Sequence, residues 1–420
     1  MKLSKYIATA LPTALIAASF LLAHGAQAQT QPPIKIGMSS AQTGPLAGGG
    51  KTCLLALQMW RDDINAKGGL LGRKVELVAY DDQGNPAVAP GIFTKLIDID
   101  KVDLLISPYG TNPTAAVLPL VMRRNLLMIG DYAFDNNAEL KYDRYFQIAP
   151  LGDGADALVE SFINPGKQLG AKTIALLGAT TEFSQAVLNG ARAIAKREGL
   201  KVVYDQSYPP TTLAFSSMLG AIKAAKPDLV FVASYPADSV AIVRAVNEIG
   251  VGNSVKLFGG AMVGLQYAAT QALLGPLLNG ITSYTYYVPE KTMDFPGIRD
   301  FLQRYSKLAI PEKIDPFGYY IAPYAYAIGQ VLEQAVSATK SLDQKVLAEY
   351  LHSHPIDTVV GSIEFGPTGE WRKPRVLQTQ FQGIVANNME QFSKPGKQVI
   401  IYPPNLKSGE LRHPFSEASK

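Results

Sequence analysis

The chain has 420 residues, of which 47% are hydrophobic and 18% are charged, and its formal net charge at pH 7 is +4. That composition is typical of a globular protein, and the length predicts two or three domain-sized cores. The near-neutral charge gives no support for nucleic-acid binding or for a basic membrane-binding surface.

The first 28 residues have the pattern of a secretory signal peptide. Lys2 and Lys5 give a positive start, an apolar run follows from Ile7 to Leu22, and Ala26-Gln27-Ala28 fits a signal-peptidase site. We therefore expect the mature chain to begin at Gln29. Its charge falls from +4 to +2, because the removed segment contains two lysines and no acidic residue. An uncleaved anchor is the alternative, although the apolar run is short for a bilayer span.

Cys53 is the only cysteine in the chain. It lies well past the cleavage site, so it offers no attachment point for a lipid there, and no internal disulfide can form. We expect a protein of the Gram-negative periplasm that is not lipid-anchored and whose fold depends on its apolar cores.

Strand-like and helix-like segments alternate through most of the mature chain. A helix over Gly50–Ala66 would place Cys53, Leu57, Trp60 and Ile64 on one face. Before Pro150 the expected strands are 35–38, 75–80 and 103–106, and the expected helices are 50–66, 87–99 and 114–123. After Pro150 the expected strands are 173–177, 202–208 and 229–233, and the expected helices are 155–169, 184–198, 215–225 and 238–249.

Short apolar strands separated by crossover helices are typical of parallel sheets covered on both faces. The βαβ arrangement is built twice, so the predicted fold is α/β with two doubly wound lobes. The most apolar helical segment is Tyr319 to Val336, but Pro323 and Glu333 interrupt it, and we expect a buried helix there instead of a membrane span. Residues 393–420 contain four prolines and are expected to form a strand remnant and an exposed tail.

The sequence offers little chemistry for an enzyme. It contains no His-Glu-x-x-His, paired-cysteine zinc or G-x-S-x-G pattern, and we expect no catalytic residue, metal or cofactor. His352 and His354 lie near a predicted helix end and are expected at the surface. Gly50-Lys51-Thr52 resembles a phosphate loop, but the spacing requires a glycine where Pro45 stands. The glycines at 48–50 more simply allow backbone to approach a ligand at a helix N-terminus.

The segment Ser107-Pro108-Tyr109-Gly110-Thr111-Asn112-Pro113-Thr114 follows a predicted strand and opens a predicted helix. Open α/β sheets bind ligands at this carboxyl edge. The amides of a helix N-terminus and the Thr111 hydroxyl would suit a carboxylate. The alternative is that Thr111 or Thr114 serves only as the cap of its helix.

Five sequence motifs carry a resemblance to a known family. They are Ile34-Lys35-Ile36-Gly37 with Thr43-Gly44-Pro45-Leu46, Asp63-Ile64-Asn65-Ala66-Lys67-Gly68-Gly69, Tyr80-Asp81-Asp82, Pro227-Asp228-Leu229-Val230, and Phe365-Gly366-Pro367-Thr368-Gly369. Together they make residues from about Ile34 to Pro404 resemble the leucine/isoleucine/valine-binding family of periplasmic proteins.

The resemblance implies a type I periplasmic binding protein, with two lobes joined by a three-stranded hinge that close over a ligand. We place the three crossings between lobes near Pro150, Thr282 and Val359. The first lobe is then expected to comprise 29–150 and 283–358, and the second lobe 151–282 and 359–395. The remaining residues, 396–420, are expected to form a C-terminal tail.

The family's ligand-binding positions can be compared with this sequence one by one. Thr111 falls where the family places a hydroxyl on the ligand carboxylate. Tyr132 and Phe134 fall on the following loop, which is two residues longer here and where the family uses small residues and backbone amides. Three further aromatic positions of the family are occupied here by Phe183, Tyr235 and Tyr320.

Two departures from the family pattern bear on the ligand. Gly49 stands where amino-acid binders carry an aromatic residue, and Met262 stands where they carry an acid for the ligand ammonium. A buried ammonium without a partner costs several kcal/mol, so an aromatic or otherwise apolar carboxylate fits this pattern better than a branched-chain amino acid. The alternative is a genuine amino-acid or amide binder, with the missing acid supplied by Asp131, Asp135 or Asp238.

The resemblance therefore implies a monomeric solute-binding component of an ABC importer of the branched-chain amino-acid type. Its partners would be a small-molecule solute and an inner-membrane ABC permease. A periplasmic sensory ligand-binding protein is the second interpretation. An enzyme is the third, and it lacks a catalytic constellation in this sequence.

Overall fold

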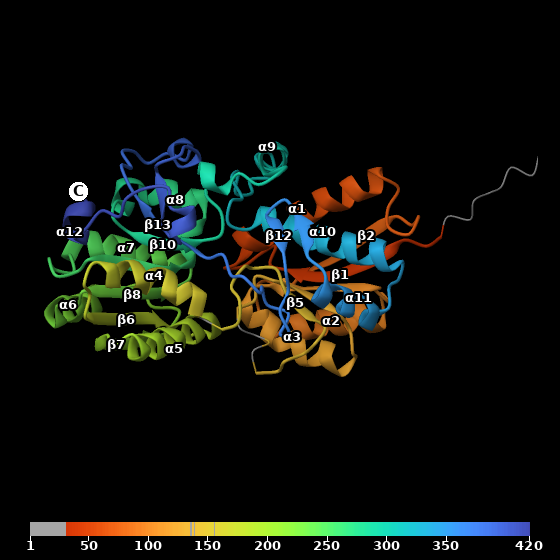
Figure 1. Cartoon of the computed structure of the whole chain (residues 1–420), viewed down its shortest axis with the longest axis horizontal. Helices are drawn as coiled ribbons and strands as arrows, with labels where there is room; N and C mark the ends of the chain where they lie inside the picture. The colour runs from red at the N-terminus through yellow and green to blue at the C-terminus, as the bar shows by residue number, and fades with distance from the viewer. Residues whose placement is uncertain (1–30, 135–136, 138, 155) are drawn as a thin grey trace, which may run out of the picture.

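The structure is a computed structural model that describes residues 31–134, 137, 139–154 and 156–420. The expected signal peptide and the mature start at Gln29 lie outside these residues. Figure 1 shows two α/β lobes side by side, with the N-terminal strands in one lobe and the C-terminal end of the chain in the other. The predicted α/β fold with two lobes is confirmed.

The sheet of the first lobe has five parallel strands in the order β2-β1-β3-β4-β5. Its strands are β1 (Ile34–Ser40), β2 (Val75–Asp81), β3 (Leu104–Tyr109), β4 (Met128–Asp131) and β5 (Tyr145–Gln147). Its helices are α1 (Ala47–Ala66), α2 (Ala89–Asp98), α3 (Thr111–Arg123), α9 (Ile298–Ala309), α10 (Ala322–Thr339) and α11 (Gln344–Ser353). A small antiparallel hairpin follows α11 and consists of β11 (Ile356–Thr358) and β12 (Gly361–Ile363).

Successive residues of the first-lobe strands contribute to cores on opposite faces of the sheet. Leu104 and Ile106 of β3 pack in the core that α1 and α10 cover, whereas Leu105 packs in the core under α2 and α3. This follows from the two-residue repeat of a strand. The predicted apolar face of the first helix is confirmed, since four side chains on it are buried: Cys53, Leu57, Trp60 and Ile64.

The helix α10 packs closely against α1. A Cβ atom on Gly329 would lie 2.0 Å from the Trp60 ring, so glycine is required at this contact. The Trp60 indole donates a hydrogen bond of 3.1 Å to Glu333. The expected buried helix is therefore present at Ala322–Thr339, and no helix in the described part of the chain has the length and apolarity that a bilayer span requires.

The sheet of the second lobe has seven strands in the order β14-β13-β10-β9-β8-β6-β7, of which β13 and β14 are antiparallel to their neighbours. Its strands are β6 (Thr173–Ala179), β7 (Lys201–Tyr208), β8 (Leu229–Ser234), β9 (Leu257–Met262), β10 (Thr282–Thr285), β13 (Leu377–Phe381) and β14 (Gln398–Tyr402). Its helices are α4 (Asp156–Gln168), α5 (Glu182–Arg197), α6 (Ser216–Ala225), α7 (Pro236–Ile249), α8 (Ala268–Leu274) and α12 (Phe415–Ala418). Short 3-10 turns are η1 (Val263–Gln266), η2 (Gly275–Leu278), η3 (Lys291–Met293), η4 (Glu390–Ser393) and η5 (Pro404–Leu406).

Two of the three expected crossings between the lobes lie elsewhere. Thr282 is not a crossing, because β10 pairs with β9 and β13 inside the second sheet through Thr285. Val359 is not a crossing either, because the chain still contacts the first lobe at Trp371, whose indole donates to the Gln147 carbonyl at 3.1 Å. The chain then passes to β13, so the boundaries expected after 282 and after 358 both move toward the C-terminus. The crossing near Pro150 agrees with the passage from β5 to α4.

The strand remnant expected within 393–420 is present as β14, but the separate C-terminal tail expected over 396–420 is wrong. The apolar run Val399-Ile400-Ile401 forms β14, which pairs antiparallel with β13 at the edge of the second sheet. Further on, the Phe415 ring stacks on Phe258 with a centroid distance of 5.2 Å. The burial of these apolar side chains outweighs the prolines, so this segment packs along the second lobe.

Candidate functional site

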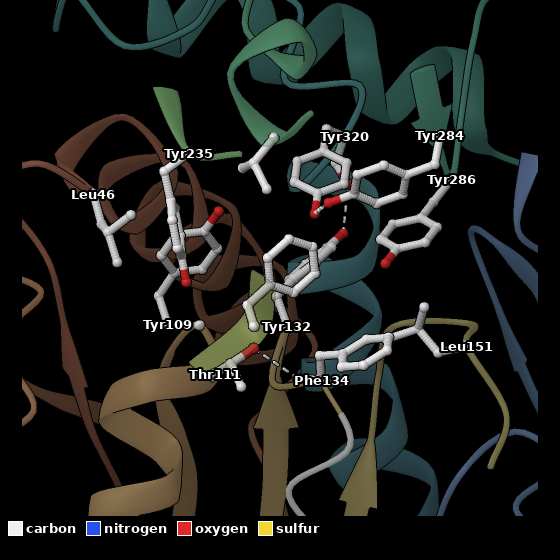
Figure 2. A pocket seen from close by; sticks show the side chains of 13 residues that line it. Leu46, Tyr109, Thr111, Tyr132, Phe134, Leu151, Tyr235, Tyr284, Tyr286 and Tyr320 are labelled. Atoms are coloured by element: carbon white, nitrogen blue, oxygen red, sulfur yellow. Dashed lines mark hydrogen bonds between the residues drawn. The ribbon is translucent and has the colours of Figure 1, made fainter. Parts of the chain in front are cut away.

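A pocket lies between the two lobes, where strands from both sheets end. β3, β4, β8, β9 and β10 each bring a residue to it at or next to their carboxyl end, as expected for a ligand site in open α/β sheets. Its volume is about 40 Å³. In the same measure, one water molecule needs roughly 10–15 Å³. Thirteen residues line it (Figure 2): Leu46, Tyr109, Gly110, Thr111, Tyr132, Phe134, Leu151, Phe183, Tyr235, Val263, Tyr284, Tyr286 and Tyr320.

Tyrosine side chains dominate the pocket, and none of the described residues that line it is an Asp, Glu, Lys, Arg or His. Burial raises the pKa of Tyr109, Tyr132, Tyr286 and Tyr320 well above the usual range for tyrosine. These phenols therefore stay neutral at physiological pH. The described lining residues present hydroxyl groups and aromatic rings to a ligand, without a countercharge from their side chains.

The tyrosines on one side of the pocket bond to one another. The Tyr284 and Tyr320 hydroxyls are 2.7 Å apart, and the Tyr286 and Tyr320 rings stack with a centroid distance of 5.3 Å. The Tyr132 hydroxyl donates to the Tyr320 carbonyl at 2.6 Å (Figure 2). Together these contacts hold the rings in fixed positions before any ligand arrives, which reduces the ordering cost of binding.

Tyr132 has a backbone conformation that a large side chain rarely adopts. Its φ of 57° lies in the left-handed region, which costs of the order of 1–3 kcal/mol for a non-glycine residue unless the surroundings hold it there. Its ring lies within 6.2 Å of four other tyrosine rings, at centroid distances that begin at 5.2 Å. Strained residues of this kind cluster at ligand sites, and Tyr132 fits that rule.

Thr111 begins α3 at the floor of the pocket. Gly110 takes the N-cap position, with a φ of 93° that favours glycine, so neither Thr111 nor Thr114 is the cap residue and that alternative is wrong. The Thr111 hydroxyl accepts a hydrogen bond of 3.0 Å from the Phe134 amide. The positive end of the α3 dipole therefore faces the pocket beside a hydroxyl group.

Aromatic rings meet across the interface between the lobes. Phe134 from the first lobe packs edge-to-face on Phe183 from the second, with a centroid distance of 5.6 Å, and Phe183 packs in the same way on Tyr235 at 5.9 Å. The Tyr235 hydroxyl also reaches Asn112 of α3 at 3.4 Å. The lobes are thus in contact around the pocket, and the conformation is closed.

A model of the family described as "periplasmic binding protein" matches residues 33–374 of this chain. The chain belongs to this family. The match covers most of both lobes, including all thirteen residues that line the pocket. The family and the fold are those of solute-binding proteins and not of enzymes.

Three known proteins illustrate what this chain is similar to in sequence or in fold. The Leu/Ile/Val-binding protein homolog 7 of Brucella abortus is 25% identical over 95% of this chain and 99% of its own length. An ABC-transporter solute-binding protein of R. palustris, solved in complex with benzoate, has a TM-score of 0.71 at 19% identity and covers 88% of this chain and 95% of its own. A branched-chain amino acid transporter substrate binding protein of Streptococcus pneumoniae, solved with isoleucine, also has a TM-score of 0.71 at 19% identity, over 88% of this chain and 100% of its own.

Six of the eight residues that the sequence suggested for ligand binding in this periplasmic binding protein line the pocket. They are Thr111, Tyr132, Phe134, Phe183, Tyr235 and Tyr320. Met262 does not line it: it is fully buried in the second-lobe core, and the next residue, Val263, lines the pocket instead. The side chains of neighbouring residues at a strand end point in opposite directions, so a shift of one residue explains this error.

Gly49 does not line the pocket either, because another side chain covers it. A Cβ atom at this position would lie 2.3 Å from the Tyr109 ring. Tyr109 therefore takes the space beside Gly49, and its ring lines the pocket. The resemblance implied an aromatic residue at position 49 in amino-acid binders; here the space beside Gly49 is filled by an aromatic ring from β3.

Two of the three acids that could have replaced the ammonium partner, Asp131 and Asp238, lie away from the pocket lining. Asp238 accepts a hydrogen bond of 2.7 Å from Tyr208 within the second lobe. Asp131 accepts one of 3.1 Å from the free thiol of Cys53, and burial raises the pKa of its carboxyl to about 7. Asp135 lies outside the described residues. Neither described acid is among the residues that line the pocket.

Sequence reasoning missed seven residues of the pocket: Leu46, Tyr109, Gly110, Leu151, Val263, Tyr284 and Tyr286. Tyr109 and Gly110 lie within the segment from Ser107 to Thr114, so a signal for them was present. Tyr284 and Tyr286 alternate along β10 and beyond it, a pattern that places both on one face of a strand. That pattern becomes informative only once β10 is known to end at the pocket.

The remaining candidates for chemistry have structural explanations. A Cβ atom on Gly50 would lie 2.2 Å from the Ala41 carbonyl oxygen, so this glycine allows α1 to pack against the protein's own backbone and not against a ligand. His352 is half-buried, and its ring nitrogens lie 3.0 and 2.8 Å from the carbonyl oxygens of Gly366 and Asp143. His354 is exposed, as expected. No group of three or more His, Cys, Asp or Glu residues suited to a metal ion occurs within the described ranges.

Proposed function

We propose that this protein is the periplasmic solute-binding component of an ABC importer and that it binds a small carboxylate with an aromatic or apolar body between its lobes. The observation that carries the proposal is the composition of the pocket, which is lined by six tyrosines, two phenylalanines and no acidic side chain among the described residues. An amino acid bound there would bury its ammonium without a countercharge, at a cost of several kcal/mol.

A carboxylate can be held in this pocket without a basic residue. The N-terminal end of α3 carries a partial positive charge and backbone amides that lack partners inside the helix, and the Thr111 hydroxyl lies beside it. Hydroxyl donors of the surrounding tyrosines add hydrogen bonds to a charged group, each of which is worth about 1.5–3 kcal/mol. The rings of Phe134, Phe183 and Tyr132 would enclose the apolar body of the ligand.

The family and the pocket between two lobes support a transport role. In this proposal the closed, ligand-bound form is delivered to an inner-membrane permease, and the protein reaches the periplasm after cleavage before Gln29. It acts as a monomer, with the solute and the permease as its partners. The benzoate complex of the R. palustris relative supports an aromatic acid as the ligand, and the isoleucine complex of the Streptococcus pneumoniae relative supports the alternative of an amino acid.

A thermal-shift screen tests the proposal, because a ligand that binds the folded state stabilises it by mass action. We expect aromatic and apolar acids such as benzoate and 4-methylpentanoate to raise the melting temperature, and leucine, isoleucine, valine and simple amides to have much smaller effects at equal concentration. Stabilisation by leucine alone would overturn the assignment of the ligand. Recovery of the bound acid unchanged after prolonged incubation is expected for a binding protein, whereas formation of product would indicate an enzyme.

A sensory role for the same pocket is the competing interpretation. Uptake of the labelled acid by cells that lack this protein distinguishes the two. Loss of uptake supports transport, whereas normal uptake with a lost transcriptional or chemotactic response supports a sensor.

A further inference from the structure

Tyr109 has a second contact that the ligand pocket does not explain. Its ring lies against the first turn of α1, in the space beside Gly49, and it is 4% exposed. Its hydroxyl lies 3.1 Å from the hydroxyl of Tyr267. Tyr109 ends β3 in the first lobe, whereas Tyr267 lies between η1 and α8 in the second lobe. The hydrogen bond therefore joins the lobes directly.

Ala268, the residue after Tyr267, is also hydrogen-bonded to a segment that packs with the first lobe. The Ala268 amide donates a hydrogen bond of 2.8 Å to the Asp315 carboxylate, which lies on the segment between α9 and α10. Two consecutive residues at the start of α8 thus bond to elements that pack with the first lobe. These bonds fix the position of the Tyr267 ring in the closed form.

Tyr267 is not one of the residues that line the ligand pocket. The hydroxyl pair therefore closes through protein groups alone, and it can form whether or not a solute is present. Burial raises the pKa of both phenols, so both remain neutral and able to donate across the physiological range.

We propose that the Tyr109–Tyr267 hydroxyl pair is a latch that favours the closed arrangement of the lobes independently of the ligand, and that Gly49 is the residue that makes room for it. In this role Tyr109 and Tyr267 are positioning residues. A hydrogen bond of ordinary net strength shifts an equilibrium by about 2- to 12-fold, so the latch gives the ligand-free protein a larger closed fraction. Because the ligand binds the closed form, that fraction multiplies its apparent affinity.

The test measures closure in the absence of any solute. Single-molecule energy transfer between dyes at two exposed positions, introduced as Arg123→Cys on α3 and Lys196→Cys on α5, reports the open and closed fractions of the mature protein. The native Cys53 is fully buried and so is protected from labelling. The variant Tyr267→Phe keeps the ring and removes only the hydroxyl. The matched control is Tyr204→Phe. It removes a hydroxyl that bonds to Gln206 within the second lobe.

We expect Tyr267→Phe to lower the ratio of closed to open molecules about 2- to 12-fold, and Tyr204→Phe to leave it unchanged. Tyr109→Phe should have the same effect as Tyr267→Phe. The double variant should have no further effect, because each single change already removes the same hydrogen bond between the two hydroxyls. Unchanged closure in Tyr267→Phe, fully additive effects in the double variant, or a parent protein that is entirely open without ligand would each overturn the proposal.

This proposal rests on the closure of two lobes and not on the identity of the solute. An error in the ligand class would appear in binding assays and leave the ligand-free closed fraction unaffected. An error in the latch would leave the preference among ligands unaffected. The two failures are therefore distinguishable.

Discussion

Adjacent glycines at the start of α1 allow a sharp test of how the pocket wall is built. A Cβ atom on Gly49 would lie 2.3 Å from the Tyr109 ring, whereas one on Gly48 would be no closer than 3.7 Å to the Tyr267 ring, an ordinary contact. In Gly49→Ala the Tyr109 ring must move by about 1 Å to restore van der Waals separation. Gly48→Ala requires no movement. The two variants therefore make the same glycine-to-alanine change and differ in whether the new Cβ atom meets the Tyr109 ring.

The expected magnitudes follow from two opposing effects. Overpacking of this kind costs about 1–3 kcal/mol, while replacing a helical glycine by alanine gains about 0.5–1 kcal/mol at most. Gly48→Ala should therefore be neutral or slightly stabilising, and Gly49→Ala should be less stable than it by about 1–3 kcal/mol. Thermal unfolding of the two variants side by side measures this difference.

Ligand binding provides the second readout for the same pair. Because Tyr109 lines the pocket, its displacement should weaken binding in Gly49→Ala and leave it unchanged in Gly48→Ala. Equal melting temperatures and equal affinities for the two variants would refute the assignment of Tyr109 as the aromatic wall beside Gly49.

Three further predictions concern the acid site, the closure and a buried carboxyl. Thr111→Val should weaken carboxylate binding by about 1.5–3 kcal/mol. The Thr114 hydroxyl bonds to Pro108 and Ser107 outside the pocket, so Thr114→Val should affect stability alone. Equal affinities of the two variants in calorimetry would contradict this. In X-ray scattering, the protein with saturating ligand should have the radius of gyration of the closed form. Tyr235→Ala should bind the ligand more weakly and close less. Normal binding by Tyr235→Ala would place the ligand on one lobe only. The pKa of Asp131, raised by burial to about 7, means that the folded state keeps a proton that the unfolded chain releases near pH 4. Stability should therefore fall as the pH rises from about 4 to 7, and Asp131→Asn should flatten that part of the melting-temperature profile; parallel profiles would show that Asp131 does not contribute.

The fold was largely predictable because its signals are local. The apolar face of α1 and the short apolar strands β6 and β8 are visible as periodicity, and the family motifs supply the order of the lobes. β10 was not predicted, since Thr282-Ser283-Tyr284-Thr285 is polar in sequence and yet buried between β9 and β13. Pairing partners that are distant in the chain determined its burial.

The site was predictable where a single element defines it. Thr111 could be identified from the order of strand, loop and helix, and Tyr235 follows the same pattern after β8. Gly49 and Met262 could not be judged correctly from the sequence. The role of Gly49 depends on the direction of the Tyr109 side chain at the end of β3, and that of Met262 on the direction of its own side chain at the end of β9. Val263 lines the pocket while Met262 packs in the core, and a sequence comparison cannot distinguish neighbours that differ only in the face they occupy.

The central proposal is that the pocket accepts a carboxylate and that its described lining residues offer no partner for an ammonium. Calorimetric titration with leucine and with 4-methylpentanoate, which is leucine without its amino group, tests that claim with two ligands of nearly equal shape. The pocket composition predicts that 4-methylpentanoate binds at least 10-fold more tightly, because leucine must bury an ammonium that none of the described lining side chains neutralises. Tighter binding of leucine would contradict the account.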